Sequence, residues 1–178
     1  VVIRPADAGE TVAAWRQALS FRRRPAALVL SRQNLPVLDR TQLAEAAGLA
    51  RGAYVLADAP GTPDLILIAT GSEVHLALAA RETLAAEGAA VRVVSTPSWE
   101  LFEEMPEDYR EAVLPPAVSR RLVIEAGSPM GWERYAGPGG RILGIDRFGA
   151  SAPGGVVIKA YGVTPENVVR QARELLGR

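Results

Sequence analysis

The segment SRQN at residues 31–34 places an arginine, Arg32, directly after an apolar run at residues 26–30. Arginine donates paired hydrogen bonds that match the oxygens of a phosphate or a carboxylate. In open α/β sheets, ligands bind beyond the carboxyl ends of the strands. If the apolar run is a buried strand, Arg32 lies where an anion would be held. The residues alone leave a second interpretation open, in which Arg32 belongs to a solvated loop.

The segment ATGSEV at residues 69–74 has the pattern of a strand, a glycine turn and a helix start. The free N–H groups of such a helix could bind a phosphate. Thr70 or Ser72 could equally cap them, with Glu73 completing a capping box from Thr70. No G-x-G-x-x-G or Walker sequence is present, and Glu73 would repel an anion. We therefore favour capping.

The glycine-rich segment at residues 125–140 begins with Glu125 at the expected end of a strand, another ligand-facing position. It also contains Trp132 and Tyr135, three residues apart. We favour packing of these two rings on one helix face against a sheet. The segment DRFGASAPGG at residues 146–155 predicts a loop whose glycine, serine and proline residues set its shape, and which could form an interface.

His75 is the single histidine of the chain, and there is no cysteine. No partner at metal-ligand spacing accompanies it, so we expect an exposed helix position, no metal site and no catalytic triad. The lack of cysteine also excludes disulfides and fits a cytoplasmic protein.

The overall composition is that of a globular chain. Of its 178 residues 48% are hydrophobic and 22% charged, and 20 basic residues balance 20 acidic ones. A net charge of zero provides no attraction for nucleic acid or an anionic membrane. No apolar run is long enough for a transmembrane helix.

The elements that must position these residues follow an α/β pattern. Residues 1–39 predict β-α-β, with Asp7 and Glu10 as a capping box and Val12, Trp15 and Leu19 on one helix face. Residues 40–63 predict a linker with a short helix near 41–47 and a first strand at 53–56. From residue 64, strands alternate with helices to the end, and Thr164 caps the last helix.

The predicted fold is α/β: a three-layer α/β/α domain with a mainly parallel sheet of about five strands, preceded by the β-α-β remnant of a second α/β domain. A lone β-α-β unit leaves both sheet edges open and too little core. The chain also starts with a strand-like VVI rather than methionine. We therefore expect a fragment of a longer protein.

Several segments in order resemble the transketolase family: residues 4–15, 27–36, 65–80, 91–103, 109–118, 123–127, 131–137 and 146–153. The resemblance covers almost the whole chain and is specific as a set, whereas TGSE alone is shared with other thiamine enzymes. It implies that residues 1–39 are the end of the middle, pyrimidine-binding domain, that residues 40–63 are the linker and first strand, and that residues 64–178 are the C-terminal domain.

The resemblance also implies a function for the intact parent, transfer of a two-carbon ketol unit between sugar phosphates in the pentose phosphate pathway. The parent would use thiamine diphosphate and a divalent cation, Mg or Ca, and would be a cytoplasmic homodimer. Arg32 falls on the family arginine that contacts the substrate phosphate. The family's catalytic, metal-binding and cofactor-binding motifs have no counterpart here, so we expect the chain alone to be inactive and to bind no cofactor.

Two alternatives remain open from the sequence. One is the corresponding part of dihydroxyacetone synthase, deoxyxylulose-phosphate synthase or a 2-oxoacid dehydrogenase β-subunit; SRQNLP argues against the last two. The other is a stand-alone regulatory module that holds a phosphorylated ligand at ATGSE.

Overall fold

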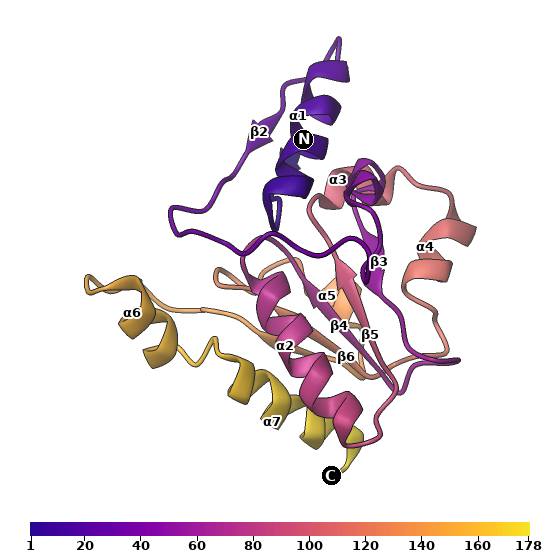
Figure 1. The fold of residues 1–178 in the computed structure, drawn as a ribbon, viewed down its shortest axis with the longest axis vertical. Helices are drawn as coiled ribbons and strands as arrows, with labels where there is room; N and C mark the ends of the chain where they lie inside the picture. Colours follow the sequence, from indigo (N-terminus) through magenta and orange to yellow (C-terminus); the bar gives the residue numbers. More distant parts are fainter.

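The computed structural model describes residues 1–178, which form two sheets and their covering helices (Figure 1). In chain order the elements are β1 Val2–Ile3, α1 Ala8–Ser20, β2 Ala27–Leu28, the 3₁₀ helix η1 Ala46–Arg51, β3 Tyr54–Ala57, β4 Leu65–Ala69, α2 Glu73–Ala86, β5 Val91–Ser95, α3 Trp99–Glu103, α4 Glu107–Val113, β6 Arg121–Ile124, α5 Glu133–Ala136, β7 Arg141–Leu143, α6 Gly154–Ala160 and α7 Pro165–Leu176. No helix has the length and apolar character needed to cross a membrane.

The larger sheet has five strands in the order β3-β5-β4-β6-β7, and only β3 is antiparallel to its neighbour. Its central strand β4 is entirely apolar and entirely buried, as expected for a strand that is covered on both faces. In register, Leu67 lies between Val93 of β5 and Leu122 of β6. The prediction of a mainly parallel sheet of about five strands is confirmed.

Alternate residues of β4 face two separate cores. Leu65 and Leu67 pack in a cluster with the buried residues of α2 and α7. Ile66 and Ile68 pack in a second cluster with Phe102 of α3 and aromatic residues around α5. The helices therefore form two outer layers, with α2 and α7 on one face of the sheet (Figure 1).

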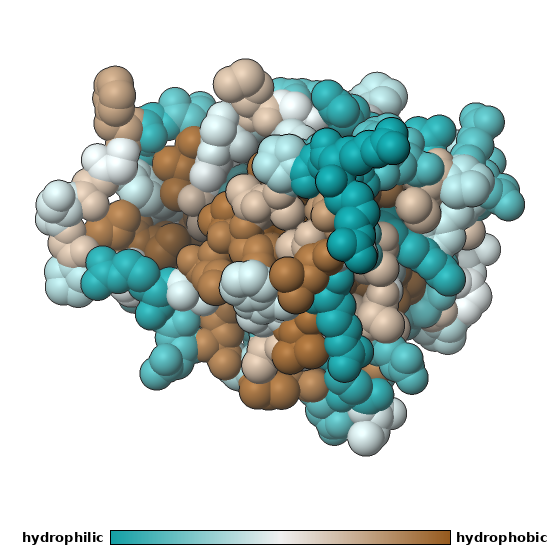
Figure 2. Space-filling view, turned by 90° about the horizontal axis from the view of Figure 1, so that it is seen from above, coloured by the Kyte–Doolittle hydropathy of each residue, from teal (hydrophilic) through white to brown (hydrophobic).

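The smaller sheet consists of β1 and β2 in parallel, joined by α1. The sequence predicted a buried strand before Arg32, and that prediction is wrong for these residues. Val29 and Leu30 are 50% and 52% exposed, because β1 is the only strand that pairs with β2. The apolar face of α1 is also exposed at Trp15, and Figure 2 shows hydrophobic side chains at the surface of this end of the molecule.

A small core joins the two sheets. Ile3 of β1 and Ala14 of α1 are fully buried against Leu49 of η1 and Leu101 of α3. The first unit is thus packed directly on helices that belong to the larger sheet.

Several predicted local features are confirmed. Asp7 accepts a hydrogen bond from the Glu10 N–H at 2.8 Å, and Thr164 accepts one from the Asn167 N–H at 3.3 Å. Helix α2 ends just before Gly88, whose φ of 82° favours glycine.

The predicted helix at residues 41–47 is wrong. The Asp39 carboxylate accepts hydrogen bonds from both the N–H and the hydroxyl of Thr41. That local turn competes with a helix, and the helical turn forms later, as η1. The strand expected at 53–56 is β3.

Candidate functional site

Arg32 lies in an exposed bend beyond β2, and its guanidinium makes no hydrogen bond or ion pair with any of the 178 residues. Its neighbours Ser31, Gln33 and Asn34 line a shallow pocket of about 430 Å³. The pocket also contains Asp7. An arginine beside such a pocket, free of internal partners, could contact an anion, so its role as a phosphate contact stays a prediction.

The carboxylate of Asp7 in this pocket is already compensated. It accepts hydrogen bonds from the Leu38 N–H at 3.0 Å and from the Arg40 Nη2 at 2.9 Å, in addition to the α1 cap. The Asp7 side chain is fully buried in this arrangement. Its negative charge is thereby balanced where an anionic ligand would approach Ser31 and its neighbours.

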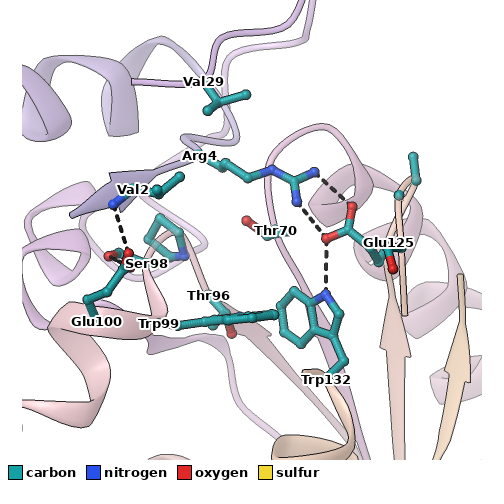
Figure 3. A pocket seen from close by; sticks show the side chains of 14 residues that line it. Val2, Arg4, Val29, Thr70, Thr96, Ser98, Trp99, Glu100, Glu125 and Trp132 are labelled. Carbon is teal, nitrogen blue, oxygen red and sulfur yellow. Dashed lines mark hydrogen bonds and ion pairs between the residues drawn. The ribbon is translucent and has the colours of Figure 1, made fainter. Parts of the chain in front are cut away.

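A larger cavity, of about 640 Å³, opens where β4, β5 and β6 end (Figure 3). Thr70 directly follows β4, Thr96 directly follows β5 and Glu125 directly follows β6. Val2 and Arg4, from the first unit, close the cavity from the other side. The cavity therefore lies at the junction of the two sheets.

Glu125 is held rigidly at one end of this cavity. Arg4 donates to it from Nη1 at 2.5 Å and from Nη2 at 2.9 Å, and Trp132 Nε1 donates at 3.1 Å (Figure 3). Arg4 Nη2 also lies 3.4 Å from Glu73. Burial raises the pKa of the Glu73 carboxyl, and the charge of Glu125 raises it further. Burial of Arg4 opposes the ionised form, but hydrogen bonds and charge from Glu125 leave the pKa of Arg4 raised.

Two tryptophans form an aromatic wall. The Trp99 and Trp132 rings meet edge to face, with centroids 4.8 Å apart and planes at 89°. Trp132 is buried, whereas Trp99 keeps part of its surface open to the cavity. Gly131, with φ of 88°, lies against the Trp99 ring, and a Cβ there would come within 2.9 Å of it.

The preference for packing of Trp132 and Tyr135 is confirmed, because both belong to the core on the α3 side of the sheet. The capping box from Thr70 is wrong. Ser72 makes no cap hydrogen bond, and Glu73 accepts from Ser72 and Arg4 instead. The first N–H groups of the helix are satisfied by carbonyls three residues earlier, including that of Thr70, so the Thr70 hydroxyl is not needed for the cap.

His75 is half-buried rather than exposed, which corrects the expectation for it. Its Nε2 lies 2.9 Å from the carbonyl oxygen of Ala6, in the segment that leads into α1. No group of three or more His, Cys, Asp or Glu residues is placed to hold a metal ion.

Sequence reasoning selected Thr70 and Glu125 but missed Arg4 and Thr96. A usable signal was present for Thr96, because it follows an apolar strand run just as Thr70 and Glu125 do. Arg4 carried no such signal, since its contacts are with residues 69 and 121 positions away.

Comparison with known proteins identifies the relatives of this chain. Residues 52–164 match the family model of the transketolase-like C-terminal domain. The transketolase of Geobacillus stearothermophilus is 56% identical over 178 residues, 99% of this chain and 27% of the relative. The transketolase of Aquifex aeolicus is 47% identical over 97% of this chain and 25% of the relative.

Solved structures give the same result. A transketolase from Leishmania mexicana superposes with a TM-score of 0.91 at 45% identity, covering 99% of this chain and 25% of that one. A Pichia stipitis transketolase, solved in complex with sedoheptulose 7-phosphate, superposes with a TM-score of 0.89 at 36% identity, over 99% of this chain and 25% of that one. The chain thus spans about a quarter of the length of the relatives it matches.

Proposed function

Because the chain belongs to the transketolase family, we propose that it is the C-terminal portion of an enzyme that transfers a two-carbon ketol unit between sugar phosphates. The observation that supports this most strongly is 56% identity to a transketolase along the full chain. The parent activity would require thiamine diphosphate and a divalent cation, Mg or Ca, and would take place in the cytoplasm.

The proposed division of the chain follows its two sheets. Residues 1–39, with β1, α1 and β2, would be the end of the middle, pyrimidine-binding domain. Residues 40–63 would form the linker and the first strand, and residues 64–178 the rest of the C-terminal domain. The separation of the two sheets supports this division.

Arg32 would hold the phosphate of a sugar-phosphate substrate. Its support is chemical: an exposed guanidinium without internal partners, beside a pocket lined by hydroxyl and amide side chains. The Pichia stipitis relative was solved with a sugar phosphate bound. The contribution of Arg32 would be to bind and orient, which lowers the entropic cost of reaching the reactive geometry.

Thiamine diphosphate supplies the carbanion chemistry of ketol transfer when it is bound. The residues of this chain do not fit the site that it needs, because none of them are grouped as ligands for the divalent cation that it requires. We therefore assign no step of the transfer to this chain, and its proposed role is substrate positioning and structural support.

The proposed partner is a second copy of the parent chain. The exposed segment at residues 146–155, with Phe148 99% exposed and Met130 nearby on the rim of the same pocket, could contribute to such an interface. No nucleic acid or membrane partner is proposed, since the net charge is zero.

A chimeric enzyme tests the function. The segment of the Geobacillus stearothermophilus transketolase that matches this chain is replaced by residues 1–178, and ketol transfer between sugar phosphates is assayed. We expect activity within about tenfold of the relative, because the replaced segment and residues 1–178 are 56% identical. The relative truncated before that segment is the control. A folded chimera without activity would contradict the proposal.

A further inference from the structure

The cavity at the ends of β4, β5 and β6 lies where the connections after neighbouring strands leave the sheet on opposite faces. After β4 the chain enters α2, on one face of the sheet, and after β5 it enters α3, on the other. The connection after β6 also leads to the α3 side, through α5. Such points open a crevice at the carboxyl ends of adjacent strands, and open α/β sheets bind their ligands there.

Two residues that line this cavity carry buried hydroxyls without a hydrogen-bond partner in the protein. These hydroxyls are Thr70 Oγ1 and Thr96 Oγ1, on residues that are 2% and 3% exposed. A buried polar group without a partner is rare in native structures and destabilises the fold. In Figure 3 the Thr70 hydroxyl faces the open centre of the cavity. A ligand with a hydrogen-bonding atom on its edge would satisfy the Thr70 hydroxyl, whereas Figure 3 draws the Thr96 oxygen on the other side of the Trp99 ring.

The walls of the cavity favour a flat ligand. Trp99 is seen edge-on in Figure 3, with one ring face toward the open space and the side chains of Val2 and Val29 on the opposite side of that space. Trp99 is fixed against Trp132, which is itself held by Glu125. A preformed slot between an aromatic face and aliphatic groups suits a planar ring better than a flexible chain.

The charges around the cavity disfavour an anion. Arg4 is the single cationic residue that lines it, and its guanidinium is occupied by Glu125 and Glu73. Glu100 and Glu125 both line the cavity as carboxylates. A phosphate placed there would meet more negative than positive charge and find no free cation.

We propose that this cavity is a binding site for an uncharged, flat heterocyclic compound. Its ring would stack on Trp99 beneath Val2 and Val29, and its polar edge would hydrogen-bond to Thr70. The volume of about 640 Å³ is within the range of small-molecule pockets, about 300–1,000 Å³. The site is formed across both sheets, so it goes beyond the proposed role of Arg32 in substrate binding.

Calorimetric titration tests this site, with adenine, uracil, nicotinamide and indole as probes up to about 10 mM, a range suited to fragment-sized ligands. The titrations use the 178-residue chain and are repeated on the chimeric enzyme. We expect saturable binding of at least one ring compound to both proteins. Adenosine monophosphate should bind more weakly than adenosine, because of the carboxylates.

Threonine-to-valine variants separate a binding role from a structural one, because valine keeps the shape and removes only the hydroxyl. Thr70→Val should weaken binding by about fivefold or more, while the melting temperature stays equal or rises. Thr83→Val, on the exposed side of α2, is the matched control and should change neither.

Four outcomes would overturn the proposal. The first is that no ring compound binds, and the second is that the Thr70 variant binds as well as the parent chain. The third is that the monophosphate binds more tightly than adenosine, and the fourth is that binding to the short chain disappears in the chimera, which would mean that upstream polypeptide fills the cavity.

Discussion

Arg4 and Glu125, which are 121 positions apart in the chain, form a two-pronged ion pair across the junction of the two sheets, at 2.5 and 2.9 Å. The Glu125 side chain is 3% exposed, whereas that of Arg4 is 32% exposed. Their pairing explains how a carboxylate can remain buried at the end of a central strand. It adds to the apolar and backbone contacts that hold the first unit on the larger sheet.

Replacing Arg4 by alanine should strongly destabilise the chain, because Glu125 would stay buried without its cation. We expect a loss of roughly 2–4 kcal/mol in the free energy of unfolding, a value reduced from that of fully buried pairs because Arg4 is partly exposed. Denaturant unfolding measures it. Arg24→Ala, which breaks the surface pair with Glu104, is the control and should change little. Equal effects of the two variants would refute the buried-pair argument.

Glu10 should make stability fall as pH rises. Its carboxyl accepts hydrogen bonds from Tyr54, Ser95 and the Ala6 N–H, but burial dominates and raises the pKa of Glu10. Between the usual glutamate pKa, about 4.3, and the raised value, the folded state keeps a proton that the unfolded state releases. The stabilisation is therefore complete below that window and is lost as pH rises through the folded-state pKa.

The Glu10→Gln variant isolates this effect from the other acidic residues. The unfolding free energy of the parent chain minus that of the variant, measured from pH 4 to pH 8 or so, should decrease as pH rises. A difference that grows with pH would instead mean that the three donors hold Glu10 ionised.

Arg32→Ala, made in the chimeric enzyme, should raise KM for phosphorylated sugars by about tenfold or more and leave kcat much less affected. The reason is that a lost charge-assisted hydrogen bond to a phosphate costs about 1.5–3 kcal/mol of binding. Unphosphorylated acceptors should show little change. Arg23→Ala, another exposed arginine without internal partners, is the control. Equal effects on both kinds of sugar would show that Arg32 does not contact the phosphate.

The 178-residue chain alone should neither bind thiamine diphosphate nor transfer ketol units, because it offers no grouped ligands for the divalent cation. Calorimetry with thiamine diphosphate and Mg²⁺ should show no saturable heat. Tight binding in that titration would contradict the proposed division of roles between this chain and the upstream part of the enzyme.

The larger sheet was predictable because its strands are largely apolar runs separated by helical segments, and this pattern is local. The solvent exposure of β2 and of the residues that follow it was not predictable in the same way. An apolar run looks the same whether neighbouring strands cover it or not, and here only β1 pairs with it. The helix expected near Thr41 failed for another local reason, since the Asp39 side chain competes for the same backbone groups.

The candidate site was predictable only in part. Thr70 and Glu125 could be selected because each follows a strand, but Thr70 was assigned to the cap rather than to a cavity. The assignment depended on whether backbone carbonyls would satisfy the first N–H groups of α2, which the sequence does not specify. Arg4 was missed because its partners come together only when the two sheets pack.

The packing of Ile3 and Ala14 on Leu49 and Leu101 has a consequence for chain continuity. The Arg4 N–H also donates to the Pro97 carbonyl at 2.8 Å, and the Arg4 carbonyl accepts from the Gly71 N–H. Residues 1–30 are therefore held on the larger sheet by their own contacts. They are also joined to it covalently through the exposed segment that follows them. A protease that nicked the polypeptide near Arg32 would leave two peptides that still migrate as one particle, and the shorter peptide could be supplied in trans.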